Sequence, residues 1–136
     1  MHEWSGPKLI SLPKIPDPRG NLSFFESGKH IPFKILRTYL IYDVPGGEIR
    51  GGHAFRKQQE FIVALSGSFD VVIKNPDRSA TSIQLNRSYK GLYLPNLLWR
   101  HMENFSTNAV CLVVSSELFD PADYIREFDE FVNLAG

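Results

Sequence analysis

Residues 47–67 read GEIRGGHAFRKQQEFIVALSG, and this stretch decides the fold. Gly47 and Gly67 mark its ends, and His53 and Glu60 lie between them. The apolar run at 61–65 is typical of a buried strand. Side chains two positions apart on a strand point to the same face, so alternate side chains around the histidine would share one face of a strand. The stretch therefore predicts β-strands, with His53 at a strand entrance.

Similar strand-forming segments continue on both sides of this stretch. They are rich in β-branched and aromatic residues, and turn sequences such as those at 17–20 and 75–77 separate them. Their spacing is typical of sandwiches and small barrels. The middle of the chain is therefore predicted to be all-β, with strands at 21–26, 33–44, 60–65, 68–74, 79–85, 91–94 and 109–115.

One helix is predicted near the C-terminus. Asp120 is a good N-cap, and Pro121 suits a first helical turn. Apolar residues then recur every three to four positions, at Tyr124, Ile125, Phe128 and Phe131. We expect this helix to cover part of the barrel, with its aromatic side chains packed in the core.

The composition excludes several classes of function. The 136 residues suit one domain spanning 1–136. Lys and Arg total 15, as do Asp and Glu, so the chain lacks the excess of cations that nucleic-acid binding requires. Its apolar runs are too short to cross a membrane, and its N-terminus lacks the apolar core of a secretion signal. Since Cys111 is the one cysteine, the expected location is the reducing cytoplasm.

Residues 47–67 resemble the first motif of the cupin superfamily, in which two histidines and a glutamate are metal ligands. His53 and Glu60 match the motif, but Phe55 occupies the position of the second histidine. Residues 91–104, GLYLPNLLWRHMEN, resemble the second motif with Arg100 in place of its metal-binding histidine. His101 is one residue late and would point to the opposite face of a strand. Because a guanidinium opposes cation binding, we predict neither a metal nor another cofactor.

Over residues 19–131 the chain is similar to the WxcM-like cupins, which are sugar-nucleotide 3,4-ketoisomerases. The similarity rests on a combination of segments: DPRGNL, the Arg-Thr-Tyr strand, RGGHA, LSGSFDVVI, GLYLPNLLW, ENFS and DYIREFDEF. The related 3,5-epimerases share the pattern at 50–55 but are longer chains. The resemblance implies an all-β, cupin-type jelly-roll barrel with a short C-terminal helix. It also implies a homodimer, and it leaves open whether the two chains exchange N-terminal strands.

The resemblance further implies that His53 is the catalytic base, which takes a proton from a carbon beside a ketone. An imidazole with a pKa of ~6.5 is largely neutral at cytoplasmic pH and can both accept and return a proton. Moving a carbonyl from C4 to C3 requires removal of the C3 proton, an enediol, and reprotonation at C4. The ketoisomerases usually carry a second histidine at the position of Phe55. His53 would therefore act alone or with a hydroxyl such as that of Tyr39, which could equally lie in the core.

Five residues are candidates for substrate binding. Arg50 and Arg19 resemble the family's residues that approach the nucleotide diphosphate. Phe55 could stack on a sugar or thymine ring, and Arg100 could polarise the substrate carbonyl or bind phosphate. Glu60 could orient the catalytic base, or it could lie exposed at the start of a strand.

The sequence thus predicts an isomerase that shifts the ketone of a nucleotide-linked 4-keto-6-deoxyhexose, of the TDP-4-keto-6-deoxyglucose type, from C4 to C3. The alternative within the same class is a 3- or 3,5-epimerase, which needs a proton donor on the opposite face of the ring. The alternative from another class is a cupin that binds sugar nucleotides or carbohydrates without turnover, because two histidines are replaced. A metal-dependent dioxygenase ranks last, since its ligands are missing.

Overall fold

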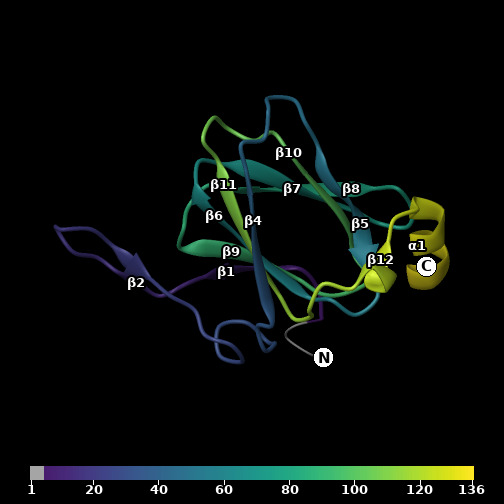
Figure 1. Ribbon diagram of the computed structural model, residues 1–136, viewed down its shortest axis with the longest axis horizontal. Coiled ribbons are helices and arrows are strands. Elements are labelled where there is room, and N and C mark those ends of the chain that lie inside the picture. Colours follow the sequence, from purple (N-terminus) through teal and green to yellow (C-terminus); the bar gives the residue numbers. More distant parts are fainter. Residues whose placement is uncertain (1–4) are drawn as a thin grey trace.

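The computed structural model describes residues 5–136, which fold into two facing five-stranded sheets (Figure 1). The first sheet has the strand order β1-β9-β6-β11-β4, and the second has the order β12-β5-β10-β7-β8. All strand pairs in both sheets are antiparallel. This confirms the predicted all-β jelly roll. The strands are β1 (Lys8–Ser11), β4 (Arg37–Tyr42), β5 (Arg50–Phe55), β6 (Glu60–Ser66), β7 (Phe69–Lys74), β8 (Ala80–Leu85), β9 (Lys90–Leu94), β10 (Trp99–Glu103), β11 (Val110–Ser115) and β12 (Tyr124–Ile125).

The core lies between the two sheets and follows the alternation of side chains along each strand. In β7, for example, Phe69, Val71 and Ile73 are buried and the residues between them are half-buried. The first sheet is also covered on part of its outer face, where Phe25, Ile31 and other apolar side chains of the segment before β4 pack against β6 and β9. Because β6 has neighbours on both faces, its first five residues are all buried.

A separate hairpin of β2 (Lys14–Ile15) and β3 (Leu22–Ser23) projects from the barrel (Figure 1). Its turn at 17–20 is closed by a bond from the Gly20 N–H to the Asp17 carbonyl at 2.9 Å, as the turn sequence predicts. The hairpin exposes Ile15 and Leu22 to solvent. These apolar side chains find no cover within the described part of the chain.

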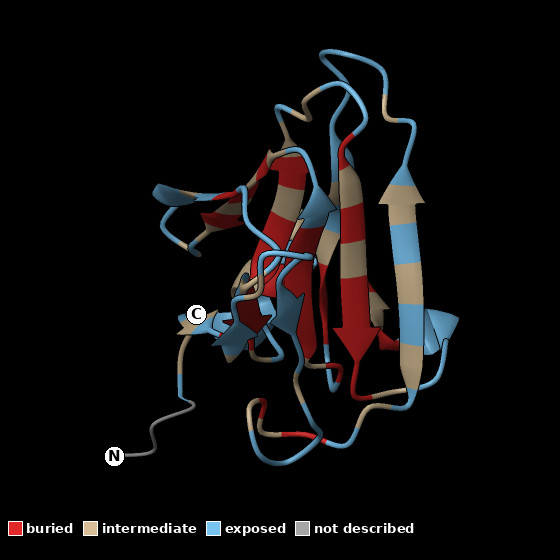
Figure 2. Ribbon diagram, turned by 90° about the vertical axis from the view of Figure 1, so that its left-hand side faces the viewer, coloured by how far each residue is buried: buried red, intermediate tan, exposed pale blue. Residues whose placement is uncertain are grey.

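Strand β4 forms one of the two edges of the first sheet, opposite β1. Its residues alternate between half-buried and exposed, which Figure 2 shows beside the buried strands of the core. Tyr39 and Ile41 face the core, whereas Leu40 and Tyr42 face outward with 52% and 61% of their surface exposed. The inward side chains of β4 therefore border the opening between the two sheets.

The C-terminal segment differs from the single predicted helix. Asp120 does cap a turn through its carboxylate, but the turn is a short 3₁₀ helix, η1 (Pro121–Asp123). The next two residues form β12 against β5, and only then does the helix α1 (Phe128–Ala135) begin. Tyr124 and Ile125 pair with the open edge of β5 because β-branched and aromatic residues suit a half-buried strand. No helix within residues 5–136 is long and apolar enough to span a bilayer.

Four strands of the two main sheets, β1, β5, β10 and β12, lie outside the strand segments predicted from apolar runs. The start of β5 is rich in glycine, and β10 contains charged residues, so neither has a strong strand signal. Strand β3 covers only 22–23 of the predicted 21–26. The other predicted strands agree with the structure to within a few residues.

Candidate active site

A cavity of about 290 Å³ opens beside the inward face of β4, between the two sheets. Two of the larger hollows, of about 440 and 410 Å³, lie against the N-terminal hairpin and the 43–50 loop, and their charged side chains are all exposed. The smaller cavity alone of these three contains buried ionisable groups. Its lining comes from β4, β5, β10 and β12 and consists of Arg37, Tyr39, Leu40, Ile41, Arg50, Gly51, His53, Arg100 and Tyr124.

His53 lies on β5 with its imidazole between two aromatic rings. Its ring centroid is 4.8 Å from that of Phe55 and 5.0 Å from that of Tyr124. The Nε2 atom is buried and has no hydrogen-bond partner within residues 5–136. Burial, and then the charges of Arg100 and Arg126, lower the pKa of His53 from its usual 6.5 to about 3. The imidazole is therefore neutral near pH 7.

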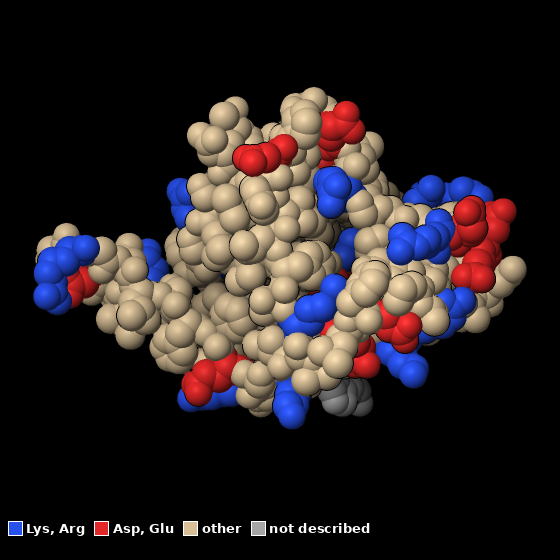
Figure 3. Space-filling view, viewed as in Figure 1, with Lys and Arg blue, Asp and Glu red and all other residues tan. Residues whose placement is uncertain are grey.

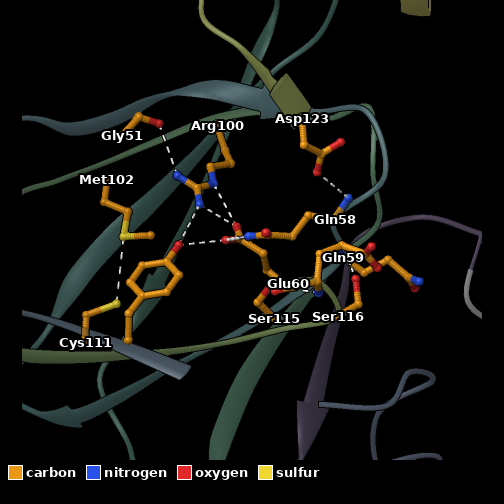
Figure 4. Close-up of polar contacts among 12 residues, drawn as sticks. Gly51, Gln58, Gln59, Glu60, Arg100, Met102, Cys111, Ser115, Ser116 and Asp123 are labelled. Carbon is orange, nitrogen blue, oxygen red and sulfur yellow. Dashed lines mark hydrogen bonds and ion pairs between the residues drawn. The ribbon is translucent and has the colours of Figure 1, made fainter. Parts of the chain in front are cut away.

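Arg100 lies on β10 at the floor of the cavity and forms a buried ion pair with Glu60 (Figure 4). Its Nη2 and Nε both donate to Glu60 Oε1, the latter at 3.1 Å, and its Nη1 donates to the Gly51 carbonyl at 3.1 Å. Burial favours a lower pKa for Arg100, but Glu60 and Tyr39 outweigh it and raise that pKa. The guanidinium is therefore a fixed cation beside His53.

Tyr39 completes this network from β4. Its hydroxyl donates to Glu60 Oε2 at 2.7 Å and accepts from Arg100 Nη2 at 3.3 Å. Burial, together with the negative charge of Glu60, raises the pKa of Tyr39, so its phenol stays protonated. Tyr39 thus lines the cavity and also packs against the core cluster.

Gln58 and Asp123 hold the network from outside the cavity. Gln58 Nε2 donates to Glu60 Oε2 at 2.9 Å, and Gln58 Oε1 accepts from Arg37 Nη2 at 3.2 Å. The buried carboxylate of Asp123 accepts the backbone N–H groups of Lys57 at 2.7 Å and of Gln58 at 3.0 Å. These two bonds hold the loop between β5 and β6 against η1. They therefore fix the position of Glu60 at the start of β6.

Gly51 allows the Arg100 guanidinium and the His53 imidazole to lie close to its backbone. It has a φ of 75°, and a Cβ atom placed on it would lie 2.6 Å from Arg100 Nη1 and 3.4 Å from His53 Cε1. A non-glycine residue would be strained at this φ and would meet the guanidinium. The first glycine of the Arg-Gly-Gly-His segment therefore leaves the room that Arg100 occupies.

The structure brings together four of the seven residues that the sequence singles out: His53, Tyr39, Arg50 and Arg100. Arg50 lies exposed at the rim of the cavity. Arg19 is elsewhere, in the turn of the projecting hairpin. Its side chain is 90% exposed and bonds Asp17 at 2.8 Å, and it does not line the cavity of its own chain.

Two expected contacts are corrected by the structure. Phe55 is buried among His53, Tyr124 and the Arg100 guanidinium, so its ring is not exposed for stacking on a sugar or a base. Glu60 is neither exposed nor bonded to His53, because its carboxylate oxygens are taken up by Arg100, Tyr39 and Gln58. Neither residue lines the cavity, and both contact residues that do.

The residues at the cupin metal position do not fit a metal ion. Phe55 has no donor atom, and the Arg100 guanidinium bonds Glu60, the carboxylate that would be a ligand. Within residues 5–136 no group of three His, Cys, Asp or Glu residues is arranged to hold a metal. Metal independence itself stays a prediction.

Sequence reasoning missed Arg37, Gln58 and Tyr124. Arg37 is two residues before Tyr39 on β4, so strand alternation alone places both on one face. Gln58 and Tyr124 gave no comparable signal, because their role depends on contacts between β12, η1 and the loop after β5.

A jelly-roll barrel with a neutral histidine in its cavity, and an ion pair at the metal position, defines a cupin suited to acid–base chemistry. Residues 5–136 match the family described as WxcM-like, C-terminal (FdtA), and the chain belongs to this family.

Known members of the family are similar over nearly the whole chain. TDP-4-oxo-6-deoxy-alpha-D-glucose-3,4-oxoisomerase of Aneurinibacillus thermoaerophilus is 40% identical over 124 residues, which cover 91% of this chain and 88% of that protein. The 3,4-ketoisomerase QdtA of Thermoanaerobacterium thermosaccharolyticum, solved as a histidine-to-asparagine mutant with TDP-4-keto-6-deoxyglucose, is 36% identical. It has a TM-score of 0.92 over 96% of this chain and 94% of that one. The TDP-quinovose 3,4-ketoisomerase WlaRB of Campylobacter jejuni is 39% identical, with a TM-score of 0.88 over 95% and 98%.

Proposed function

We propose that the protein is a 3,4-ketoisomerase of a TDP-linked 4-keto-6-deoxyhexose. The observation that carries the proposal is the neutral His53 imidazole, whose Nε2 has no hydrogen-bond partner among residues 5–136 and which lines a cavity together with Tyr39 and Arg100. Relatives at 36–40% identity that act on such sugars supply the substrate class.

The reaction needs one proton carrier and no oxidant. His53 takes the proton from C3, and the electron pair of that C–H bond forms a C3–C4 double bond while the C4 carbonyl oxygen becomes an oxyanion. The oxygen on C4 gains the proton that the oxygen on C3 releases. The proton on His53 exchanges with solvent while the enediol is bound, and His53 then donates a proton to C4 as the C3 carbonyl forms, so protons and electrons balance without an oxidant.

Arg100 and Tyr39 support this step electrostatically. Negative charge develops on the sugar oxygens in the enediolate, and a fixed guanidinium in a partly water-excluded cavity stabilises it without reorganisation. Tyr39 remains a protonated phenol and couples this cation to Glu60.

The decisive test is incubation with TDP-4-keto-6-deoxyglucose in deuterated water, followed by proton NMR. A new 3-ketone with deuterium at C4 supports the isomerase. Exchange at C3 or C5 with inverted configuration would instead identify an epimerase. Tight binding without any exchange would identify a sugar-nucleotide-binding cupin.

We also infer a homodimer, in which the hairpin of one chain reaches the cavity of the other. The exposed Leu40 and Tyr42 on β4, with Ile15 and Leu22 on the hairpin, supply apolar surface for such an interface. Arg19 in the hairpin turn would then approach the diphosphate held by the second chain, as the family resemblance implies. A cytoplasmic location stays a prediction that rests on the sequence.

Mixing two inactive variants tests this arrangement. If Arg19 serves the partner's cavity, refolded mixtures of Arg19→Ala and His53→Asn regain activity, because the hybrid dimer contains one site with both residues intact. No regain of activity, or a monomer in light scattering, would contradict the shared site.

A further inference from the structure

The shortest strand of the second sheet supplies one wall of the active-site cavity. Strand β12 has two residues, and its Tyr124 pairs with Phe55 of β5. Side chains opposite or diagonal to each other across two paired strands lie within contact distance. The centroid of the Tyr124 ring accordingly lies 4.7 Å from that of Phe55 and 5.0 Å from that of His53. The position of β12 therefore determines how closely the His53 imidazole is confined.

Arg56, the residue that follows β5, holds this strand by its backbone. Its Nη1 donates to the Tyr124 carbonyl at 3.0 Å and to the Ala122 carbonyl of η1 at 3.1 Å. The Tyr124 N–H donates to the Pro121 carbonyl. Both backbone polar groups of Tyr124 are thus bonded outside the β5 ladder. Because a ladder of two residues is marginal on its own, these bonds fix the place of β12.

The ion pair between Arg56 and α1 does not explain this arrangement. Arg56 Nη2 lies 3.0 Å from Glu130 Oε1, and the two side chains are 40% and 50% exposed. Exposed ion pairs of this kind contribute little to stability. Figure 3 shows basic and acidic side chains beside one another around α1, on the right of the molecule, where Arg78 forms a second exposed pair with Asp129 at 3.7 Å. Arg56 differs from Arg78 because its guanidinium also bonds the strand beside the histidine.

We infer that Arg56 is a positioning residue, which holds the Tyr124 ring against His53 through the carbonyls of Ala122 and Tyr124. This inference rests on the proposed function, because it takes His53 as the base. Arg56 does not line the cavity, so its side chain affects the imidazole without contacting the substrate. The rate depends steeply on the alignment of the base with the C–H bond, and nucleotide binding does not. A displaced Tyr124 ring therefore lowers kcat and leaves TDP affinity unchanged.

Kinetics and NMR spectroscopy of Arg56→Met test the inference. The substitution leaves the bond from the backbone N–H of residue 56 to the Asp123 carbonyl in place. We expect kcat to fall about 10-fold, while TDP affinity, measured by calorimetry, stays within about twofold of wild type. In protein labelled at the histidine rings, the His53 signal is identified by its absence in His53→Asn. This signal should move in Arg56→Met, because the Tyr124 ring no longer lies against the imidazole.

Three further variants separate the strand contact from the helix contact. Glu130→Gln removes the charge on α1 that faces Arg56 and leaves the two strand bonds. Arg78→Met breaks the other exposed pair of α1. Both should keep the wild-type His53 signal and a kcat within about twofold of wild type. Arg56→Lys keeps the charge but not the planar fork, and should give an intermediate kcat and an intermediate His53 signal.

The outcomes distinguish this inference from the proposed function. Wild-type kcat in Arg56→Met, an unmoved His53 signal, or an equal fall of kcat in Glu130→Gln would each overturn the positioning role while the isomerase proposal stands. An inactive wild-type protein would overturn both, because His53 would then not be a catalytic base. If Arg56→Met does not fold, as judged by circular dichroism, a wild-type kcat and His53 signal in Arg56→Lys would overturn the positioning role instead.

Discussion

At the scale of single residues, the environment of His53 sets the pKa of the proposed catalytic base. Burial and two nearby arginines hold its pKa at about 3 in the folded chain, against about 6.5 in an unfolded one. Between pH ~3 and ~6.5, His53 is protonated in the unfolded state but neutral in the folded state. The contribution of His53 to folding stability is therefore fully present above pH ~6.5 and is lost as the pH falls toward 3.

The same shift predicts the pH dependence of activity. Since kcat/KM reports the ionisation of the free enzyme, we expect no acid limb near pH 6.5, and a kcat/KM that stays within about twofold from pH ~7.5 to ~5. Initial rates at constant ionic strength measure this. A tenfold fall in kcat/KM centred on pH ~6.5 would show that His53 titrates normally and that the depressed pKa is wrong.

The two adjacent glycines before His53 offer a matched comparison. Gly51→Ala should lower kcat by about 10-fold or more, because its Cβ would displace the Arg100 guanidinium and small misplacements in active sites are costly. Gly52→Ala should keep activity within about twofold, since its added Cβ would have only a Trp99 ring atom near it, at 3.9 Å. Equal effects of the two substitutions would mean that room at position 51 is not needed for the reaction.

At the scale of elements, the sequence predicted the strands whose apolar residues build the core. The run at 61–65 and the alternation in β7 are local signals that tertiary contacts reinforce. Site residues lie instead on β5 and β10. The glycines at the start of β5 and the charged residues of β10 weaken the sequence signal for a strand. Residues 124–125 were predicted as helix, because periodicity cannot show that β5 has an open edge nearby.

The link between η1 and the β5–β6 loop should matter for stability. Asp123→Ala removes two hydrogen bonds from a buried carboxylate, and we expect a loss of about 2–4 kcal/mol in the free energy of unfolding. Asp120→Ala removes only the exposed cap of η1 and should cost about 1 kcal/mol. Urea unfolding of both variants measures the difference, and equal losses would argue against a special role for Asp123.

At the scale of the whole molecule, the barrel keeps the cupin cavity and fills its metal position with an ion pair. The identities of Phe55 and Arg100 show from sequence alone that two of the four cupin ligand positions lack a metal-binding histidine. The network itself was not predictable, because Glu60, Tyr39 and Arg100 come from three strands that meet only in the folded barrel. The sequence also could not predict that Arg19 lies away from the cavity of its own chain, because this depends on the fold.

We therefore expect activity to survive removal of metals. Prolonged dialysis against a chelator should leave kcat and KM unchanged, and metal analysis of the purified protein should find no stoichiometric transition metal. One tightly held ion per chain, or activity that returns only when a divalent ion is added back, would contradict this expectation.

The central claim is that His53 alone carries the proton between C3 and C4, and the rate of deuterium incorporation in His53→Asn tests it most directly. An amide of similar size keeps a hydrogen bond, so TDP affinity should stay within about threefold of wild type. Incorporation at C4, measured by proton NMR in deuterated water, should be slower by about 100-fold or more. Incorporation at the wild-type rate in His53→Asn would contradict the mechanism.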